Sequence, residues 1–207
     1  MKADTSDTFD TRRNRALVLI ADIHGAQTRK GTNVPDWYHL ARVSRVLDSV
    51  LLESHEGAQE AREAIILAAI CHDALEDTDI RSRELETYVG SRALSYVEAM
   101  TNKEGGGIHE PYVSQVVKAP EEVRLIKLAD LYDNYTNVLF VLPTVRTEWA
   151  ESFFMPIVEP MTKALLQMEF HTYPATALFL KGMVRISSQL LREEIVRYNG
   201  EKHVRLN

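Results

Sequence analysis

Apolar residues recur at helical spacing along almost the whole chain, and this periodicity limits the fold more than any other feature of the sequence. In residues 14–27 and again in residues 38–54 the apolar side chains fall on one side of a helix. Alternation of apolar and polar residues, the pattern of a half-buried strand, forms no convincing run anywhere. The sequence therefore predicts an all-α fold.

Proline, glycine and short polar stretches divide this pattern into segments. The expected helical segments are 14–27, 38–54, 58–76, 82–101 with a break at Gly90, 109–118, 121–140, 146–168 and 174–198. We expect Pro143 to end the sixth of these, Pro156 and Pro160 to kink or split the seventh, and Gly200 to close the last. No internal repeat or linker marks a domain boundary. We therefore expect one domain over residues 10–200, with tails at 1–9 and 201–207.

Composition is that of an ordinary globular protein, with 207 residues of which 45% are hydrophobic and 26% charged. The single cysteine, Cys71, excludes a disulfide within the chain and fits a reducing compartment. The polar N-terminus lacks the apolar core of a signal peptide, and no apolar run reaches the roughly 20 residues of a membrane helix. We expect a cytoplasmic protein without a membrane partner.

The formal net charge of −6 argues against a nucleic-acid partner, because such proteins present a basic surface to phosphates. An anionic small molecule remains a suitable substrate if local basic side chains or a metal ion attract it. A homo-oligomer is compatible with the sequence, which does not decide the oligomeric state.

The segment AREAIILAAICHDALEDTD, residues 61–79, places ionisable side chains directly after a buried-looking run. In one continuous helix, His72 and Glu76 would stack one turn apart, as would Asp73 and Asp77. Buried carboxylates without partners are costly, and several of them together repel one another. A divalent cation is the simplest remedy.

Two further segments supply partners for this cation. The helix around KLADLYDN, residues 127–134, embeds Asp130 among apolar residues, and His39 follows a loop that carries basic residues. Two imidazoles with two carboxylates suit Mn²⁺, Fe²⁺, Co²⁺ or Zn²⁺ better than Mg²⁺ or Ca²⁺, which prefer oxygen ligands alone. The absence of thiolate ligands argues against a structural zinc site. The candidate ligands are His39, His72, Asp73 and Asp130.

Each of these residues also has an ordinary interpretation when taken alone. The histidine–aspartate pair could end a helix in solvent, and Asp130 could pair with Lys127. Cys71 is better explained as a small buried thiol than as a ligand. His24, on an apolar face, is better explained as a hydrogen-bonded structural histidine.

Three stretches resemble the motifs of a known family, both in their residues and in their order along the chain. QTRKGTNVPDWYH, CHDALEDT and KLADLYDN resemble the motifs of the RelA/SpoT-type alarmone hydrolases of the HD superfamily, over residues 14 to about 140. The resemblance implies a single HD-domain helical bundle and a stand-alone small alarmone hydrolase. It further implies a nucleotide substrate, (p)ppGpp, whose 3′-pyrophosphate is removed to give GDP or GTP and pyrophosphate, with Mn²⁺ as the metal.

Matching positions carry the family's residue roles onto this chain. The metal ligands would be His39, His72, Asp73 and Asp130. Glu76 and Asp77 would orient and deprotonate the attacking water. Substrate contacts would come from Arg29 and Lys30, from Asn134 near the sugar, and from Lys103 after the segment that ends at Thr101.

Two departures from the family pattern concern the substrate rather than the metal. Asp36 stands near the place of a tyrosine expected to frame the base, and Asp133 is expected to add negative charge close to the anion site. An adenine alarmone such as (p)ppApp therefore stays an alternative substrate, as do NADPH and other nucleotides of HD hydrolases. A non-catalytic HD module that binds a partner, for example as an antitoxin, is the alternative of another class.

Overall fold

The structure is a computed structural model that describes residues 7–103, 110–145 and 147–205. Within these residues the chain is built of helices and contains no strand, and one isolated antiparallel bridge joins Thr28 to Pro35. The all-α prediction is confirmed. No helix of the described part is both long enough and apolar enough to cross a membrane.

Eleven α-helices and one π-helical segment are present in these described ranges. They are α1 (Phe9–His24), α2 (Trp37–Ser54), α3 (Gln59–Ile70), α4 (Ala74–Asp77), α5 (Ser82–Val89), α6 (Ser91–Met100), α7 (Glu110–Lys118), α8 (Glu121–Val141), α9 (Thr147–Trp149), η1 (Ala150–Phe154), α10 (Met155–Gln167) and α11 (Pro174–Arg205).

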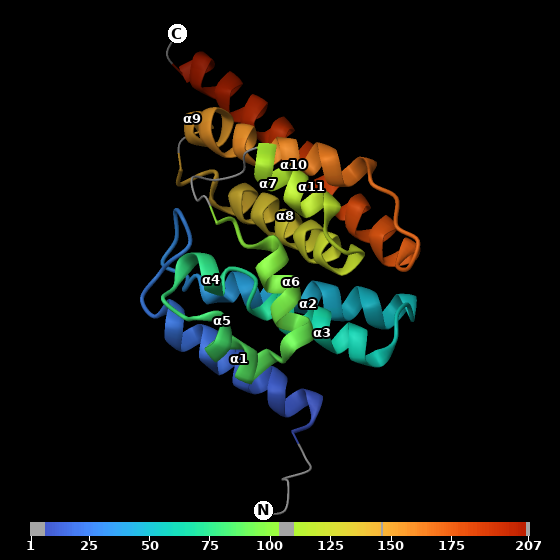
Figure 1. The fold of residues 1–207 in the computed structure, drawn as a ribbon. Helices are drawn as coiled ribbons and strands as arrows, with labels where there is room; N and C mark the ends of the chain where they lie inside the picture. The colour runs from blue at the N-terminus through green and yellow to red at the C-terminus, as the bar shows by residue number, and fades with distance from the viewer. Residues whose placement is uncertain (1–6, 104–109, 146, 206–207) are drawn as a thin grey trace, which may run out of the picture.

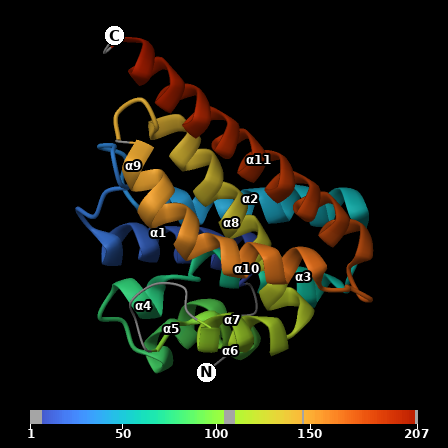
Figure 2. The same ribbon diagram turned by 90° about the horizontal axis from the view of Figure 1, so that it is seen from above.

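Helix α8 runs through the middle of the bundle (Figures 1 and 2). On one side it packs against α2, α3 and α6, and on the other side α10 and the long α11 cover it. The apolar run of α3 is buried from Ala64 onward and continues through Cys71. Because α2, α3 and α8 contact one another in this core, polar side chains near their contacts are enclosed together.

The expected continuous helix over 58–76 is wrong, because α3 ends at Ile70 and α4 begins at Ala74. The His72 imidazole explains the break: its Nδ1 lies 2.8 Å from the Ala69 carbonyl oxygen, which would otherwise accept the N–H of Asp73 in a continuous helix. His72 and Asp73 therefore lie in a turn rather than on a helix face. The expected stacking of His72 over Glu76 is wrong for the same reason, whereas Asp73 is the N-cap residue of α4 and its carbonyl accepts the Asp77 N–H at 2.9 Å.

Two other boundaries differ from expectation, and one expected disruption is present. Helix α1 begins at Phe9, where Thr8 caps it by accepting the Thr11 N–H at 3.3 Å. The last helix continues through Gly200 to Arg205. The expected segment 146–168 is divided by the π-helical turn η1 directly before Pro156, in agreement with the expected proline disruption.

Candidate metal centre and active site

His39 lies in the first turn of α2 and is fully enclosed, with 1% of its surface exposed. Its Nδ1 is 2.7 Å from Asp133 Oδ2, and its Nε2 is 3.0 Å from Asp130 Oδ1. Both aspartates belong to α8, so the imidazole bridges the contact between α2 and α8. With Nδ1 engaged by Asp133, Nε2 is the nitrogen directed at the remaining acidic groups.

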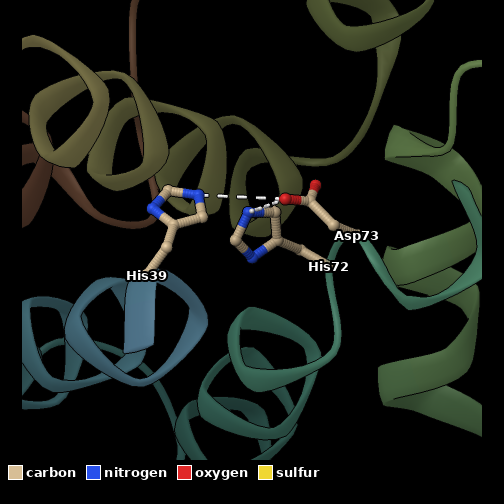
Figure 3. A group of neighbouring side chains, drawn as sticks. All are labelled: His39, His72 and Asp73. Carbon is tan, nitrogen blue, oxygen red and sulfur yellow. Dashed lines mark ion pairs between the residues drawn. The ribbon is translucent and has the colours of Figure 1, made fainter. Parts of the chain in front are cut away.

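His72 is equally buried and points into the same space. Its Nδ1 is engaged by the Ala69 carbonyl, and its buried Nε2 has no hydrogen-bond partner among the described residues. Asp73 Oδ2 lies 3.3 Å from this nitrogen and Asp130 Oδ1 lies 3.7 Å from it, as ion-pair contacts without hydrogen-bond geometry. Figure 3 shows His39 and His72 both approaching the Asp73 carboxylate.

The arrangement fits a divalent cation. Nitrogen atoms of His39 and His72 and an oxygen atom of Asp73 all lie within 4.8 Å of one another, and Asp130 approaches both histidines. The buried Nε2 of His72 has no hydrogen bond among the described residues and lies within 4 Å of two carboxylates, an environment suited to a cation. Metal-binding histidines usually engage their second ring nitrogen in a hydrogen bond, as both do here. The structure thus brings together all four residues that the sequence proposed as ligands.

The charges in this group are strongly coupled. Burial lowers the pKa of His72, but Asp73 and Asp130 outweigh burial and raise that pKa well above its usual value. Burial raises the pKa of Asp73, yet His72 and His39 hold it below its usual range. The pKa of Asp130 is also held well below its usual range, against burial, first by Lys127 and then by the histidines. A cation entering this group would therefore replace the proton of His72.

Glu76 and Asp77 follow in the short helix α4. Partial burial raises the pKa of Glu76 to about 7, in spite of the hydrogen bond that the Asn102 N–H donates to its Oε1 at 2.6 Å. Asp73 raises the Glu76 pKa further, and burial together with Asp73 also raises the pKa of Asp77. A carboxylate whose pKa is near 7 is suited to take a proton at neutral pH.

Arg29 and Asn134 form a chain of hydrogen bonds that leads to the proposed ligands. Arg29 donates to Asn134 Oδ1 at 2.6 Å, and Asn134 donates from Nδ2 to Asp130 Oδ1 at 2.6 Å. Arg29 also donates to Asp36 at 3.3 Å, so the acid at the tyrosine position is an ion-pair partner. The structure thus places Arg29 and Asn134 beside the metal-ligand candidates.

The loop that carries Arg29 is closed by a tight contact with the end of α8. Gly31 has a φ of +76°, and a Cβ atom there would lie 2.7 Å from Val145 Cγ1. The Asp36 N–H donates to the Gln27 carbonyl at 2.8 Å, which closes the loop at its base. Glycine at this position is therefore required by both backbone conformation and space.

The other two expected substrate contacts are not joined to this group by any contact that the structure records. Lys30 is exposed, and its Nζ lies 5.8 Å from the centre of the Trp149 ring. Lys103 is exposed and lines a separate cavity of about 330 Å³ together with Ile80 and Arg81. Their expected role stays a prediction.

Asp133 was expected to add negative charge near the anion site, and in the structure this charge is paired with Arg42. Its carboxylate is buried and accepts two hydrogen bonds from Arg42, at 2.6 and 2.8 Å, in addition to its contact with His39. Burial raises the pKa of Asp133, but these hydrogen bonds outweigh it and lower the pKa to about 2. Spacing carries a signal that sequence reasoning missed: Asp130 and Asp133 are three apart on α8, and His39 and Arg42 are three apart on α2.

Two ordinary interpretations are confirmed. His24 Nδ1 lies 3.0 Å from Gln27 Oε1, which makes His24 a hydrogen-bonded structural residue. Cys71 is fully buried, and burial raises the pKa of its thiol to about 12. Neither residue belongs to the group of metal-ligand candidates.

Known proteins resemble this chain in sequence and in fold, although no model of a protein family matches it. The guanosine-3′,5′-bis(diphosphate) 3′-pyrophosphohydrolase of Aquifex aeolicus (strain VF5) is 28% identical over 200 residues, which make up 89% of this chain and 27% of that protein. The guanosine-3′,5′-bis(diphosphate) 3′-pyrophosphohydrolase MESH1 of Mus musculus is 31% identical over 140 residues, or 66% of this chain and 73% of that protein. This chain thus spans a much smaller share of the Aquifex protein than of the mouse protein.

A solved structure reported as a metazoan ortholog of SpoT that hydrolyzes ppGpp superposes with a TM-score of 0.67. It is 22% identical in sequence and covers 95% of this chain and 98% of its own, so it supports the fold. The mouse relative adds a sequence match over most of its length, and the HD motifs lie at the enclosed histidine–aspartate group. The chain belongs to the family of guanosine-3′,5′-bis(diphosphate) 3′-pyrophosphohydrolases, the HD-type alarmone hydrolases.

Proposed function

We propose that this protein hydrolyses (p)ppGpp to GDP or GTP and pyrophosphate. Relatives that carry this activity in their names match the chain at 28% and 31% identity. The observation that supports the proposal most directly is the pair of enclosed histidines: each has its Nδ1 engaged, and His72 Nε2 is left without a hydrogen bond among the described residues. Two imidazoles held in this way can bind a divalent cation, and the proposed hydrolysis requires one.

The proposed cation ligands are His39, His72, Asp73 and Asp130. The mixture of imidazole and carboxylate supports a transition metal over Mg²⁺ or Ca²⁺, and the family resemblance favours Mn²⁺ among the candidates. When bound, such a cation acidifies a coordinated water and stabilises charge on phosphoryl oxygens. The enclosed position of the ligands excludes bulk water, which strengthens these electrostatic effects.

Proton transfer is assigned to the acidic pair of α4. The water oxygen attacks the phosphorus attached to O3′ and stays in the pyrophosphate. The bond between this phosphorus and O3′ breaks with its electron pair on O3′, which takes up a proton from solvent to give the 3′-hydroxyl. Glu76 takes the proton of the water, because its pKa of about 7 keeps a large basic fraction at neutral pH. Asp77, whose carboxyl is also raised in pKa, orients the water beside it.

Substrate recognition is assigned to the loop before α2 and to the middle of α8. Arg29 and Asn134, which are hydrogen-bonded to each other, are assigned the contacts with a phosphate and with the ribose. Lys30 and Lys103 are exposed cations that can meet the outer phosphates. The Asp133 carboxylate is paired with Arg42, which offsets the negative charge that had made an adenine nucleotide an alternative substrate.

The partner proposed for this chain is therefore a small nucleotide rather than a nucleic acid. The net charge of −6 supports this choice, because proteins that bind nucleic acids present a basic surface to the phosphates. The location proposed is the cytoplasm, where a lone buried cysteine stays reduced.

The experiment compares ppGpp, pppGpp, ppApp, NADPH and deoxynucleoside triphosphates as substrates, with Mn²⁺ and with Mg²⁺. We expect GDP and pyrophosphate from ppGpp in Mn²⁺, and no product after chelation. Faster turnover of ppApp or NADPH would reassign the substrate while keeping the chemistry. No turnover of any nucleotide by a protein that binds the cation would support a binding module instead.

A further inference from the structure

We propose that Asp133, held by Arg42, is a positioning residue that orients His39 for cation binding. Neither residue has a role in the family motifs described above. The inference rests on the proposed function only in so far as it needs a cation between His39 and the other ligands.

Asp133 of α8 contacts two side chains of α2, those of His39 and Arg42. Asp133 Oδ2 lies 2.7 Å from His39 Nδ1 and 2.8 Å from a terminal nitrogen of Arg42. The other oxygen, Oδ1, accepts the Nε–H of Arg42 at 2.6 Å. With both oxygens held by the guanidinium, the carboxylate cannot rotate freely. The orientation of the Asp133 carboxylate relative to the His39 ring is therefore fixed.

This contact decides which imidazole nitrogen is available to a cation. A carboxylate accepts hydrogen bonds and cannot donate one, so His39 must carry a proton on Nδ1. The Nε2 nitrogen then faces Asp130 at 3.0 Å and Asp73 at 3.8 Å. Among metal-bound histidines, such an outer carboxylate fixes the tautomer and raises the basicity of the ligating nitrogen.

The two histidines differ in this respect. His72 donates to a neutral carbonyl, that of Ala69, whereas His39 donates to a charged carboxylate. His39 is therefore the stronger donor to a cation and the one whose strength depends on another side chain. A substitution at Asp133 should weaken cation binding although it changes none of the four ligands.

A simpler explanation is that Asp133 and Arg42 only fasten α8 to α2. If that were their only role, a variant that loses the contact would be less stable but would bind the cation with unchanged affinity. Arg42 is 42% exposed and lines an open cavity of about 430 Å³, so its guanidinium can be solvated when the pair is broken. The two roles are separated by measuring cation affinity and stability on the same variants.

The experiment measures binding of Mn²⁺ alone by calorimetry and the midpoint of urea unfolding for each variant. The variants are Asp133→Leu, which removes the acceptor, Asp133→Asn, which keeps an acceptor without charge, and Arg42→Gln. The control is Glu159→Gln, which removes another carboxylate held by an arginine, Arg192, at 2.7 Å on α10 and α11.

We expect Asp133→Leu to weaken Mn²⁺ binding by roughly 10- to 100-fold, the usual effect of removing an outer partner of a metal ligand. Asp133→Asn and Arg42→Gln should fall between this variant and the parent, and Glu159→Gln should match the parent. If the leucine variant does not fold, the asparagine and glutamine variants carry the same comparison. A Kd within twofold of the parent in every folded variant at Asp133 and Arg42 would overturn the proposal.

A second measurement separates this inference from the proposed function. Nitrogen NMR of the metal-free protein should show a proton on His39 Nδ1 that is lost to rapid solvent exchange in Asp133→Leu. That result supports the orientation of His39 even in a protein that hydrolyses no alarmone. An unprotonated Nδ1 in the parent would overturn the positioning role whatever the enzyme's activity.

Discussion

Replacing Asp130 and replacing Asp73 should have different effects on stability, although we assign both residues to the same cation. Asp130 lies 2.7 Å from Lys127 Nζ, and the two residues are 3% and 8% exposed. Asp73 has a side chain that is 24% exposed, and its recorded ion pairs join it to His39 and His72. Removal of Asp130 thus strands a buried lysine, whereas removal of Asp73 does not.

The magnitude follows from the burial of the ion pair. Removing one partner of a buried ion pair destabilises a protein by about 3–5 kcal/mol, because the other charge stays enclosed without compensation. For a chain of this size each kcal/mol corresponds to about 2–4 °C, so Asp130→Ala should lower the melting temperature by about 6–20 °C. Asp73→Ala should cost less than Asp130→Ala, because the Asp73 side chain is partly exposed and Asp130 remains beside both histidines.

The assay is urea unfolding in the presence of a chelator, followed by circular dichroism, with Mn²⁺ content measured on separate samples. Both variants should lose Mn²⁺ and hydrolysis, and Asp73→Ala should keep the helical fold. The control is the double variant Lys127→Met with Asp130→Leu, which should regain most of the lost stability because no charge is stranded. Equal stability of Asp130→Ala and Asp73→Ala would refute this reasoning, as would full activity in Asp73→Ala.

Three further predictions concern the chemistry and the loop. Glu76→Gln should keep Mn²⁺ and lose about 10²–10⁴-fold in kcat, the usual contribution of a general base; a kcat equal to that of the parent would move this role elsewhere. Asp73 and Asp130 raise the pKa of His72 in the metal-free protein, so a cation competes with a proton for this imidazole. Mn²⁺ binding should therefore release protons and become tighter as pH rises. Calorimetry in buffers of different ionisation enthalpy measures this release, and a binding heat that is the same in every buffer would contradict it. Gly31→Ala should lower stability by about 1–3 kcal/mol and raise KM, since its Cβ meets Val145 at 2.7 Å in a backbone conformation with positive φ; unchanged unfolding and kinetics would contradict this.

Much of the fold could be predicted because helical periodicity is a local property. The apolar spacing of residues 38–54 corresponds to α2, and the dense apolar run after Ala64 corresponds to the buried part of α3. The grouping of His39 with Asp130 also followed from sequence, since family motifs encode contacts between distant segments that periodicity cannot.

The break after Ile70 could not be predicted from periodicity, because it depends on a side chain competing for a backbone carbonyl. The His72 imidazole takes the Ala69 carbonyl and ends α3 at the point where the metal-ligand candidates begin. Helix propensity describes the backbone of this segment well and says nothing of that competition.

The role of Asp133 was missed for a different reason. A charged residue near a proposed anion site was judged by its charge alone, whereas its effect depends on Arg42, which lies 91 residues earlier. This pairing can be seen only once α2 and α8 are packed against each other. Asp36 was likewise judged by its charge alone, although Arg29 in the same loop forms an ion pair with it.

The most direct test of the account is the rate of pyrophosphate release from ppGpp as Mn²⁺ is added stepwise to the metal-free protein, with bound Mn²⁺ counted by electron paramagnetic resonance in the same samples. We predict that the rate rises in proportion to occupancy and levels off when each chain holds one ion at His39, His72, Asp73 and Asp130. The Asp73→Ala variant should show neither binding nor release. A rate that is independent of bound Mn²⁺, or undiminished in Asp73→Ala, would contradict the central claim.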